Sequence, residues 1–291
     1  MSFDLHKPAT ISEAVGLATR LAPAARYIAG GTDLVIQINR KKISPDHLID
    51  LGRLPGLVGI AETADGFSLG SLTNYRAIEL HPAFQGRLSC LVEAARVVGG
   101  HQVRNIATVG GNIVNASPAA DFVPALLALD AVLEIAGPTG NRTVGLEQFI
   151  VGPGKTELRP AEIVTAIRFS RLPDRSATAF LKEGRRKAME ISVVCVAACL
   201  TLDESGSRCV SARLAVGAAA PKAMRPKEAE ACLSDQPAGR ASFAKAGRLA
   251  AEAAAPISDV RASAAHRRHL VAVMVERALT MCHERIVEEC R

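Results

Sequence analysis

The sequence has no tryptophan, and aromatic residues make up only 3% of its 291 positions. Proteins that bind single-stranded nucleic acid stack bases on aromatic side chains, so this scarcity argues against such a partner. The sequence also has no apolar run of membrane-spanning length, because its longest runs, around 191–200 and 123–129, are far too short. No cationic leader precedes an apolar stretch in residues 1–6, so we expect no signal peptide.

Cysteines and basic residues are spread along the chain rather than clustered. The seven cysteines include no pair with the two-residue gap of a zinc or iron–sulfur ligand set. We therefore expect buried free thiols, no metal site in this chain, and a cytoplasmic protein. The formal net charge is +6, but the basic clusters at 40–42, 185–187 and 267–268 are short. We expect these clusters to be solvated surface.

Two pairs of adjacent glycines are the most informative feature that the sequence does contain. The first lies in Ala29-Gly30-Gly31-Thr32-Asp33 and the second in Thr108-Val109-Gly110-Gly111-Asn112. Glycines can take positive φ, so successive amide groups in such turns can converge on one anion. We expect two turns that grip one elongated diphosphate ligand, for which a dinucleotide is the natural candidate. Neither pair fits the G-x-G-x-x-G or P-loop pattern, and two unrelated turns remain the alternative.

Polar residues beyond these pairs offer further candidate contacts. Asn112, Ser117 and Asp121 could bind sugar hydroxyls, while Ser117 and Asp121 could equally cap and charge the start of a helix. Lys182, at the end of an expected strand, could place a cation near a redox cofactor or simply lie at the surface. The sequence shows no catalytic triad, and His101 has no partner at a supporting spacing. We expect no catalytic side chain and a chain that holds a reactive cofactor.

Hydrophobic patterning predicts an α+β protein in three parts, with a boundary near 171–175. Residues 1–55 form a small β-α-β unit. Its helix begins with a capping box, which Thr10 and Glu13 form. Residues 56–175 mix strands with helices, and residues 176–291 form a compact domain. Strands in that last domain are expected near 178–183, 191–202 and 208–217, and helices near 226–233, 239–253 and 262–283.

Taken in order, these segments resemble the FAD-binding medium subunit of molybdenum hydroxylases, the xanthine dehydrogenase family. The resemblance runs through the two glycine segments, Gln102-Val103-Arg104-Asn105, Ser117-Pro118-Ala119-Ala120-Asp121, Phe180 to Arg186, and Met189-Glu190-Ile191-Ser192. The loop Gly152-Pro153-Gly154-Lys155 is most similar to bacterial xanthine dehydrogenase FAD subunits. The family's fold is a two-subdomain FAD-binding domain of the PCMH type, followed by a three-stranded sheet with three helices.

The resemblance implies that FAD lies extended between the N-terminal unit and the middle domain. The FAD-contacting positions that it implies are Ile28, Ala29, Gly30, Gly31, Thr32, Asp33, Leu34, Thr108, Val109, Gly110, Gly111, Asn112, Ser117, Asp121, Val164 and Lys182. Val164 is the apolar position near the flavin in this set.

The resemblance also implies partners and a role in electron transfer. A large subunit would carry molybdopterin, a small subunit would carry two [2Fe–2S] clusters, and NAD or another acceptor would take electrons from this FAD. The substrate expected from the nearest resemblance is a purine such as xanthine or hypoxanthine. A stand-alone FAD-dependent oxidoreductase and a non-catalytic nucleotide-binding protein remain the alternatives.

Overall fold

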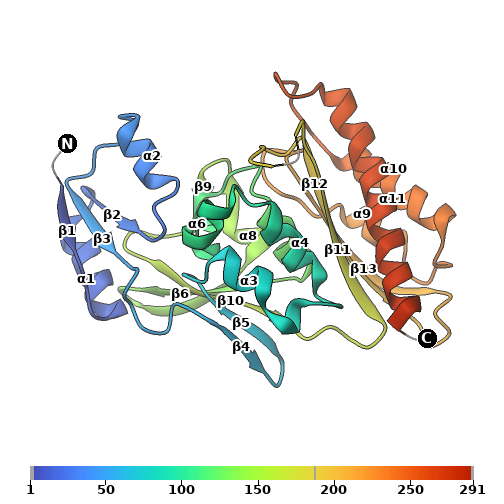
Figure 1. Cartoon of the computed structure of the whole chain (residues 1–291), viewed down its shortest axis with the longest axis horizontal. Coiled ribbons are helices and arrows are strands. Elements are labelled where there is room, and N and C mark those ends of the chain that lie inside the picture. The colour runs from blue at the N-terminus through green and yellow to red at the C-terminus, as the bar shows by residue number, and fades with distance from the viewer. Residues whose placement is uncertain (1–2, 187, 290–291) are drawn as a thin grey trace.

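A computed structural model describes residues 3–186 and 188–289 of the chain. Its three parts follow one another in chain order along the long axis of the molecule, with the two termini at opposite ends (Figure 1). Each part has a sheet of its own, and helices fill the space between the second sheet and the third.

The N-terminal part is a three-stranded parallel sheet with a capped helix on it. Its elements are β1 (Asp4–His6), α1 (Ile11–Leu21), β2 (Ala25–Ile28), α2 (Leu34–Asn39) and β3 (His47–Asp50), with the strand order β1-β3-β2. The Thr10 hydroxyl accepts a hydrogen bond from the Glu13 amide at 3.1 Å, and the Glu13 carboxylate accepts one from the Ala9 amide at 2.7 Å. The predicted capping box is thus formed, with Ala9 as the second donor. Leu72 and Ile163 of the middle part complete the small core under α1.

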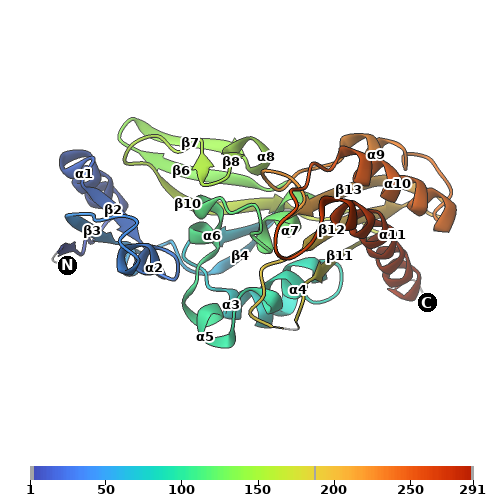
Figure 2. The same ribbon diagram turned by 90° about the horizontal axis from the view of Figure 1, so that it is seen from above.

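The middle part is a five-stranded antiparallel sheet with helices that share its core (Figure 2). Its strands are β4 (Ile60–Thr63), β5 (Gly66–Gly70), β6 (Val132–Gly137), β7 (Gly140–Gly145) and β10 (Ile163–Ser170), in the order β4-β5-β10-β6-β7. Its helices are α3 (Tyr75–Leu80), the short η1 (Pro82–Phe84), α4 (Ser89–Val97), α5 (His101–Ile106), α6 (Val109–Asn115), α7 (Phe122–Ala128) and α8 (Leu146–Phe149). A separate hairpin joins β8 (Ile150–Gly152) to β9 (Lys155–Thr156). Leu69, Leu133 and Ile167 are fully buried where the sheet meets the helices.

The C-terminal part is an antiparallel sheet buried on both faces. Its elements are β11 (Ser176–Glu183), β12 (Val194–Leu202), β13 (Cys209–Gly217), α9 (Lys227–Ala231), α10 (Arg240–Ala253) and α11 (Ala264–Glu289). Cys195 and Ala197 on one face of β12 join the core of the middle part, whereas Val196 and Ala198 on the other face pack in the core formed with α10 and α11. Because successive strand residues point to opposite faces, a sheet covered on both sides requires an unbroken apolar strand. All nine residues of β12 are accordingly buried.

The predicted α+β class, with three strands and three helices in the last part, is confirmed. The helix that Ser117 was expected to cap begins only at Phe122, with Asp121 at its N-cap position, and residues 101–106 form a helix that the pattern did not predict. The domain boundaries stay a prediction, because residues beyond 176, such as Phe180, belong to the core of the middle part.

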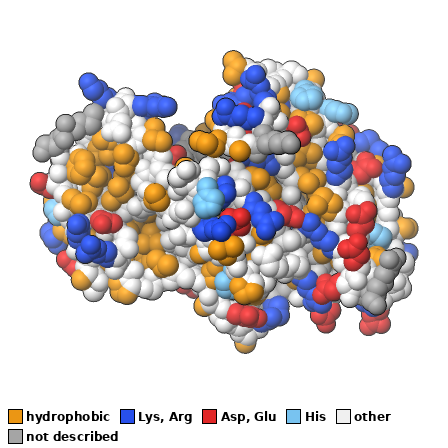
Figure 3. Space-filling model, viewed as in Figure 1, with side chains coloured by type: hydrophobic (Ala, Val, Ile, Leu, Met, Phe, Trp, Pro, Cys, Tyr) orange, Lys and Arg blue, Asp and Glu red, His pale blue; other side chains and the backbone are white. Residues whose placement is uncertain are grey.

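The expected distribution of charge is confirmed at residues 40–42, 185, 186 and 268, which are exposed, whereas Lys187 lies outside the described residues. The expectation is wrong for Arg267, which is buried because its guanidinium donates to the Val193 and Ala218 carbonyls and pairs with Asp259. Figure 3 shows lysine and arginine side chains scattered among acidic and apolar ones on the face that it presents. The six described cysteines are free thiols, and five of them are buried, as expected. Within residues 3–186 and 188–289, no helix combines the length and the apolar character that crossing a bilayer requires.

Candidate functional site

A cavity of about 570 Å³ lies where the N-terminal part meets the middle part. This volume is typical of sites for small molecules and cofactors. The loop from β2 to α2, the first turns of α6 and the strand β10 all contribute to its wall. The predicted residues that line it are Ala29, Gly30, Gly31, Thr32, Asp33, Leu34, Thr108, Gly110, Gly111, Asn112 and Val164. The structure therefore brings both glycine segments to one cavity.

The other predicted residues lie outside the described lining of this cavity. They are Ile28, Val109, Ser117, Asp121 and Lys182. Ile28 ends β2 and packs beneath Gly31, and Val109 is fully buried. The Ser117 hydroxyl accepts a long hydrogen bond of 3.3 Å from the Ala119 amide.

The loop from β2 to α2 offers a row of unused backbone donors. Residues 30–34 all line the cavity. Their amide hydrogens have no acceptor in residues 3–186 or 188–289. Gly31 has φ +69°, the left-handed region that turns successive amides toward a common point. The next amide, of Val35, is bonded to the Gly31 carbonyl at 3.0 Å. Five free donors beside a cavity fit an anion such as a diphosphate.

Asp33 adds an acid to this loop. Its partial burial raises the pKa of its carboxyl above the usual range.

Gly30 is required for a reason other than φ. A Cβ at this position would lie 2.2 Å from the carbonyl oxygen of Ile106 and 3.1 Å from the Cα of Ala107. Backbone at such distances cannot give way cheaply, so only glycine allows the first loop to pack on the junction between α5 and α6. Gly30 therefore fixes where the free amides lie relative to α6.

The second glycine pair is not the turn that its sequence suggested. Gly110 and Gly111 lie in the first turn of α6, with helical backbone and no positive φ. The Gly110 amide donates to the Ser71 carbonyl at 2.7 Å, and the Gly111 amide donates to the Thr108 hydroxyl at 3.2 Å. A Cβ on Gly110 would lie 2.7 Å from the Cβ of Ser71. The expectation of a second anion-binding turn is therefore wrong, because these amides already have partners and the glycines serve close packing.

Asp121 and Lys182 form a buried ion pair with each other. Lys182 Nζ lies 2.6 Å from Asp121 Oδ2 and also donates to the carbonyls of Val97, at 3.2 Å, and Glu190, at 2.8 Å. The Ser192 hydroxyl donates to the other carboxylate oxygen. Burial raises the pKa of Asp121, and Lys182 opposes that shift. The pair joins the middle part to β11.

The ion pair leaves two predicted roles unfilled in the free chain. Asp121 makes no side-chain cap at the start of α7 in the described structure. Lys182 faces a second cavity of about 340 Å³, which is formed mainly by residues 182–186 and 188–190. The resemblance alone carries the proposal that these two residues contact FAD.

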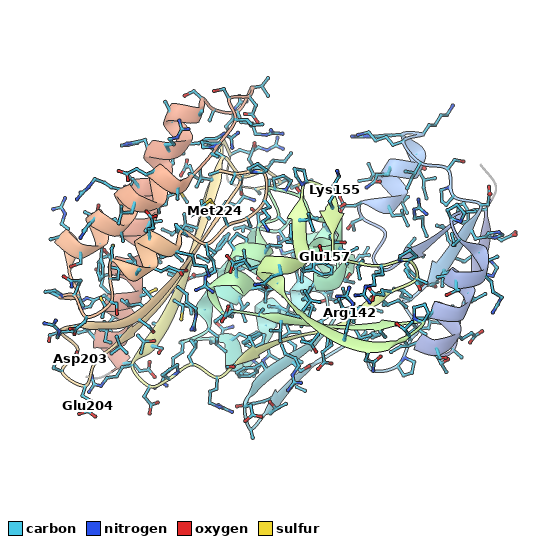
Figure 4. The ribbon with its side chains drawn as sticks, turned by 180° about the vertical axis from the view of Figure 1, so that it is seen from behind. Arg142, Lys155, Glu157, Asp203, Glu204 and Met224 are labelled. Carbon is cyan, nitrogen blue, oxygen red and sulfur yellow. The ribbon has the colours of Figure 1, made fainter. Side chains whose placement is uncertain are left out.

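Arg142 fixes the rear wall of the first cavity. Its guanidinium bonds both carboxylate oxygens of Glu162 at 2.7 Å and the Glu157 carbonyl at 2.7 Å. Figure 4 shows Arg142 near Glu157 and Lys155 on the back of the middle part. Because Glu162 lines the cavity and precedes β10, this bidentate pair holds the strand that carries Val164 in place.

Two buried polar atoms in the cavity wall have no partner in the described structure. They are the Tyr75 hydroxyl and Asn112 Oδ1. Sequence reasoning selected Asn112 but missed Tyr75. The sequence signal for Tyr75 was the rarity of tyrosine, because the chain has only two. Rarity does not indicate where a residue lies in the fold.

The geometry agrees with the comparisons with known proteins. Residues 1–172 match the family model described as the FAD binding domain in molybdopterin dehydrogenase. The chain belongs to this family. Residues 179–282 match the CO dehydrogenase flavoprotein C-terminal domain. The predicted membership in the FAD-binding medium subunits of molybdenum hydroxylases is thus confirmed.

Known proteins match the chain over almost its whole length. The chain is 35% identical over 277 residues to the putative xanthine dehydrogenase FAD-binding subunit of Escherichia coli K12, with 94% of each chain covered. It is 32% identical over 278 residues to the carbon monoxide dehydrogenase medium chain of Afipia carboxidovorans, with 96% of each covered. The crystal structure of cyanide-inactivated Cu,Mo-CO dehydrogenase contains a chain that superimposes with a TM-score of 0.93 at 31% identity, covering 98% of this chain and 99% of that one.

The residues of the cavity fit the cofactor that defines the family. The free amides of residues 30–34 suit the diphosphate of FAD. The unpaired Tyr75 hydroxyl and Asn112 Oδ1 suit a ligand with both acceptor and donor groups. The apolar Val164 side chain lies in the same wall. We conclude that this family member has a cavity suited to FAD.

Proposed function

We propose that this chain is the FAD-carrying electron-transfer subunit of a heterotrimeric molybdenum hydroxylase that oxidises a purine such as xanthine or hypoxanthine. The observation that carries the proposal is the row of five free amides beside the cavity, at residues 30–34. Bound FAD supplies the chemistry that links one-electron iron–sulfur carriers to a two-electron acceptor.

We assign separate tasks to the residues around the cavity. The loop of residues 30–34 holds the diphosphate, and Gly30 sets its position against Ile106. Thr108 and the two glycines of α6 bring the helix close enough to complete the wall. Asp121 and Lys182 place a charged pair where the middle part meets β11. Of the remaining predicted positions, Ile28 and Val109 support these segments from behind, whereas the resemblance alone carries the proposal that Ser117 contacts FAD.

The proposed partners follow from the subunit names of the relatives and from the share of their length that this chain covers. This chain spans 94% of a chain named FAD-binding subunit, 96% of one named medium chain and 80% of one named FAD-subunit. The molybdopterin and the [2Fe–2S] clusters would therefore lie on a large and a small subunit, and NAD or another acceptor would take the electrons. The xanthine dehydrogenase subunit of E. coli, at 35% identity, supports a purine substrate. The free thiols support a cytoplasmic location.

The test is purification of the tagged chain from the cells that make it, with its partners identified by mass spectrometry. We expect two co-purifying chains, one FAD for each copy of this chain, and molybdenum and iron in the complex. Xanthine should reduce the flavin absorbance and support reduction of NAD, whereas carbon monoxide and nicotinate should not.

Each rival has its own outcome in the same experiment. Turnover of an organic substrate by the chain alone would favour a stand-alone oxidoreductase. A bound nucleotide that dithionite does not reduce would favour a non-catalytic binding protein. A complex free of flavin would overturn the proposal, and turnover of carbon monoxide or nicotinate alone would change its substrate.

A further inference from the structure

Tyr75 is a buried phenol in the wall of the first cavity. Its side chain is fully buried and lines the cavity, and its hydroxyl has no hydrogen-bond partner in residues 3–186 or 188–289. Buried polar groups in folded proteins are nearly always bonded, so an exception points to a missing ligand. The chain's other tyrosine, Tyr27, donates to the Ala161 carbonyl at 2.9 Å.

The surrounding structure prevents Tyr75 from finding a partner elsewhere. It is the first residue of α3, whose start is capped by the Asn74 side chain through the Ala77 amide at 2.8 Å. Its ring packs edge-on against Phe122, with 5.1 Å between the ring centroids. A ring held in this way has little freedom to turn, so its hydroxyl stays buried beside the cavity.

The hydroxyl is a donor, because it keeps its proton. Burial raises the pKa of Tyr75 well above its usual value, and the nearby negative charges of Asp121 and Asp33 raise it further. Asn112 Oδ1 is the second unpartnered buried atom in this wall, and it is an acceptor. A ligand that satisfies both must present an acceptor and a donor, and a hydroxyl-bearing chain next to a diphosphate presents both.

We propose that Tyr75 is a binding residue that donates its phenolic hydrogen to an oxygen of the ribityl-diphosphate chain of FAD. The proposal rests on the proposed function, because it takes FAD as the ligand. It adds a residue from α3 to a site that the sequence placed only on the two glycine segments and four later positions. The free chain then holds an unsatisfied donor that the cofactor satisfies.

Tyr75→Phe tests this idea because its two expected effects differ. It removes only the hydroxyl, so the dissociation constant of FAD should rise about tenfold, the value of one good hydrogen bond. The melting temperature of the FAD-free chain should stay level or rise, because an unsatisfied buried group has been removed. Both quantities are measured on the full chain, by titration with FAD and by thermal unfolding without it.

Tyr27→Phe is the matched control for the loss of a hydroxyl. It deprives the Ala161 carbonyl of its donor, so the melting temperature of the FAD-free chain should fall. Two results would overturn the proposal. One is an FAD affinity of Tyr75→Phe within twofold of wild type, and the other is a fall in its FAD-free melting temperature as large as that of Tyr27→Phe.

The wild-type titration separates this proposal from the one on which it rests. If the wild-type chain, alone and with its co-purified partners, takes up no FAD, the proposed function fails and this inference fails with it. If wild type binds FAD and Tyr75→Phe binds it equally well, only the role of Tyr75 is lost.

Discussion

The two glycine pairs read alike in the sequence but differ in almost every physical respect. In the first pair, Gly31 takes a left-handed backbone, and the amides of the loop are free. In the second pair, Gly110 and Gly111 are helical, and their amides are bonded. The first loop can bind an anion, whereas the second segment forms a closely packed wall.

The comparison shows that a glycine can be needed for two unrelated reasons. Gly31 supplies a conformation, while Gly30 and Gly110 supply the absence of a side chain where two backbones meet. Gly30 also connects the two segments, because it packs on Ile106 and Ala107, directly before the cap residue Thr108. The pairs therefore act as a loop and its support rather than as twin turns.

The largest expected effect belongs to Gly30→Ala. The new Cβ would lie 2.2 Å from the Ile106 oxygen, which is backbone and cannot rotate away. We expect the free energy of unfolding to fall by about 3 kcal/mol, the upper part of the range for overpacked sites, and FAD binding to be lost. Urea unfolding and the flavin content of the purified chain measure the two effects. Wild-type flavin content would show that the contact does not position the loop.

Gly110→Ala should be the next most damaging change, through packing alone. Its Cβ would meet the Cβ of Ser71 at 2.7 Å and the Ser71 carbonyl oxygen at 2.8 Å. We expect a loss of about 2 kcal/mol in the free energy of unfolding, again for overpacking. Adding Ser71→Gly removes one of the two contacts and should restore part of the loss. FAD affinity should fall less than in Gly30→Ala, and an equal fall would contradict the division between loop and wall.

Much of the fold followed from local patterns, because those patterns are satisfied locally. The Thr10 capping box formed where the sequence placed it. The apolar run of β12 became a strand that is covered on both faces. The family followed from motifs in order, and the two family models match the stretches that hold them, residues 1–172 and 179–282.

What the sequence could not determine depends on partners far away in the chain. Gly110 is helical because its amide finds the Ser71 carbonyl, a contact that no local pattern encodes. Asp121 and Lys182 each looked like a candidate ligand contact, and the fold paired them with each other. Tyr75 is buried beside the cavity because Phe122 packs on its ring. These roles arise only when segments meet in space.

Gly31→Ala should have a moderate effect that comes from conformation. A Cβ disfavours φ +69° by roughly 1–2 kcal/mol, and the side chains of Val35 and Ile28 lie only 3.2 and 3.3 Å from it. We expect a loss of about 1.5 kcal/mol in the free energy of unfolding and weaker FAD binding, because the free amides change direction. Gly31→Asn should cost less, since asparagine tolerates the left-handed region. Equal losses for the two variants would point to crowding rather than φ.

The smallest expected effect belongs to Gly111→Ala, in which two terms oppose each other. Alanine favours the helix over glycine by roughly 0.5–1 kcal/mol. Its Cβ, however, would lie 2.9 Å from the Thr108 hydroxyl that caps α6. Displacing that cap costs about 1 kcal/mol, so the free energy of unfolding should change little.

A double-mutant cycle separates these terms. Thr108→Ala alone should lose about 1 kcal/mol, and Gly111→Ala added to it should recover part of that loss, because the cap hydroxyl is no longer there to be displaced. If Gly111→Ala destabilises the chain equally in both backgrounds, the cap is not what it disturbs. The second glycine pair would then be required for a reason other than close packing at the start of α6. Its difference from the loop of residues 30–34 would need another physical explanation.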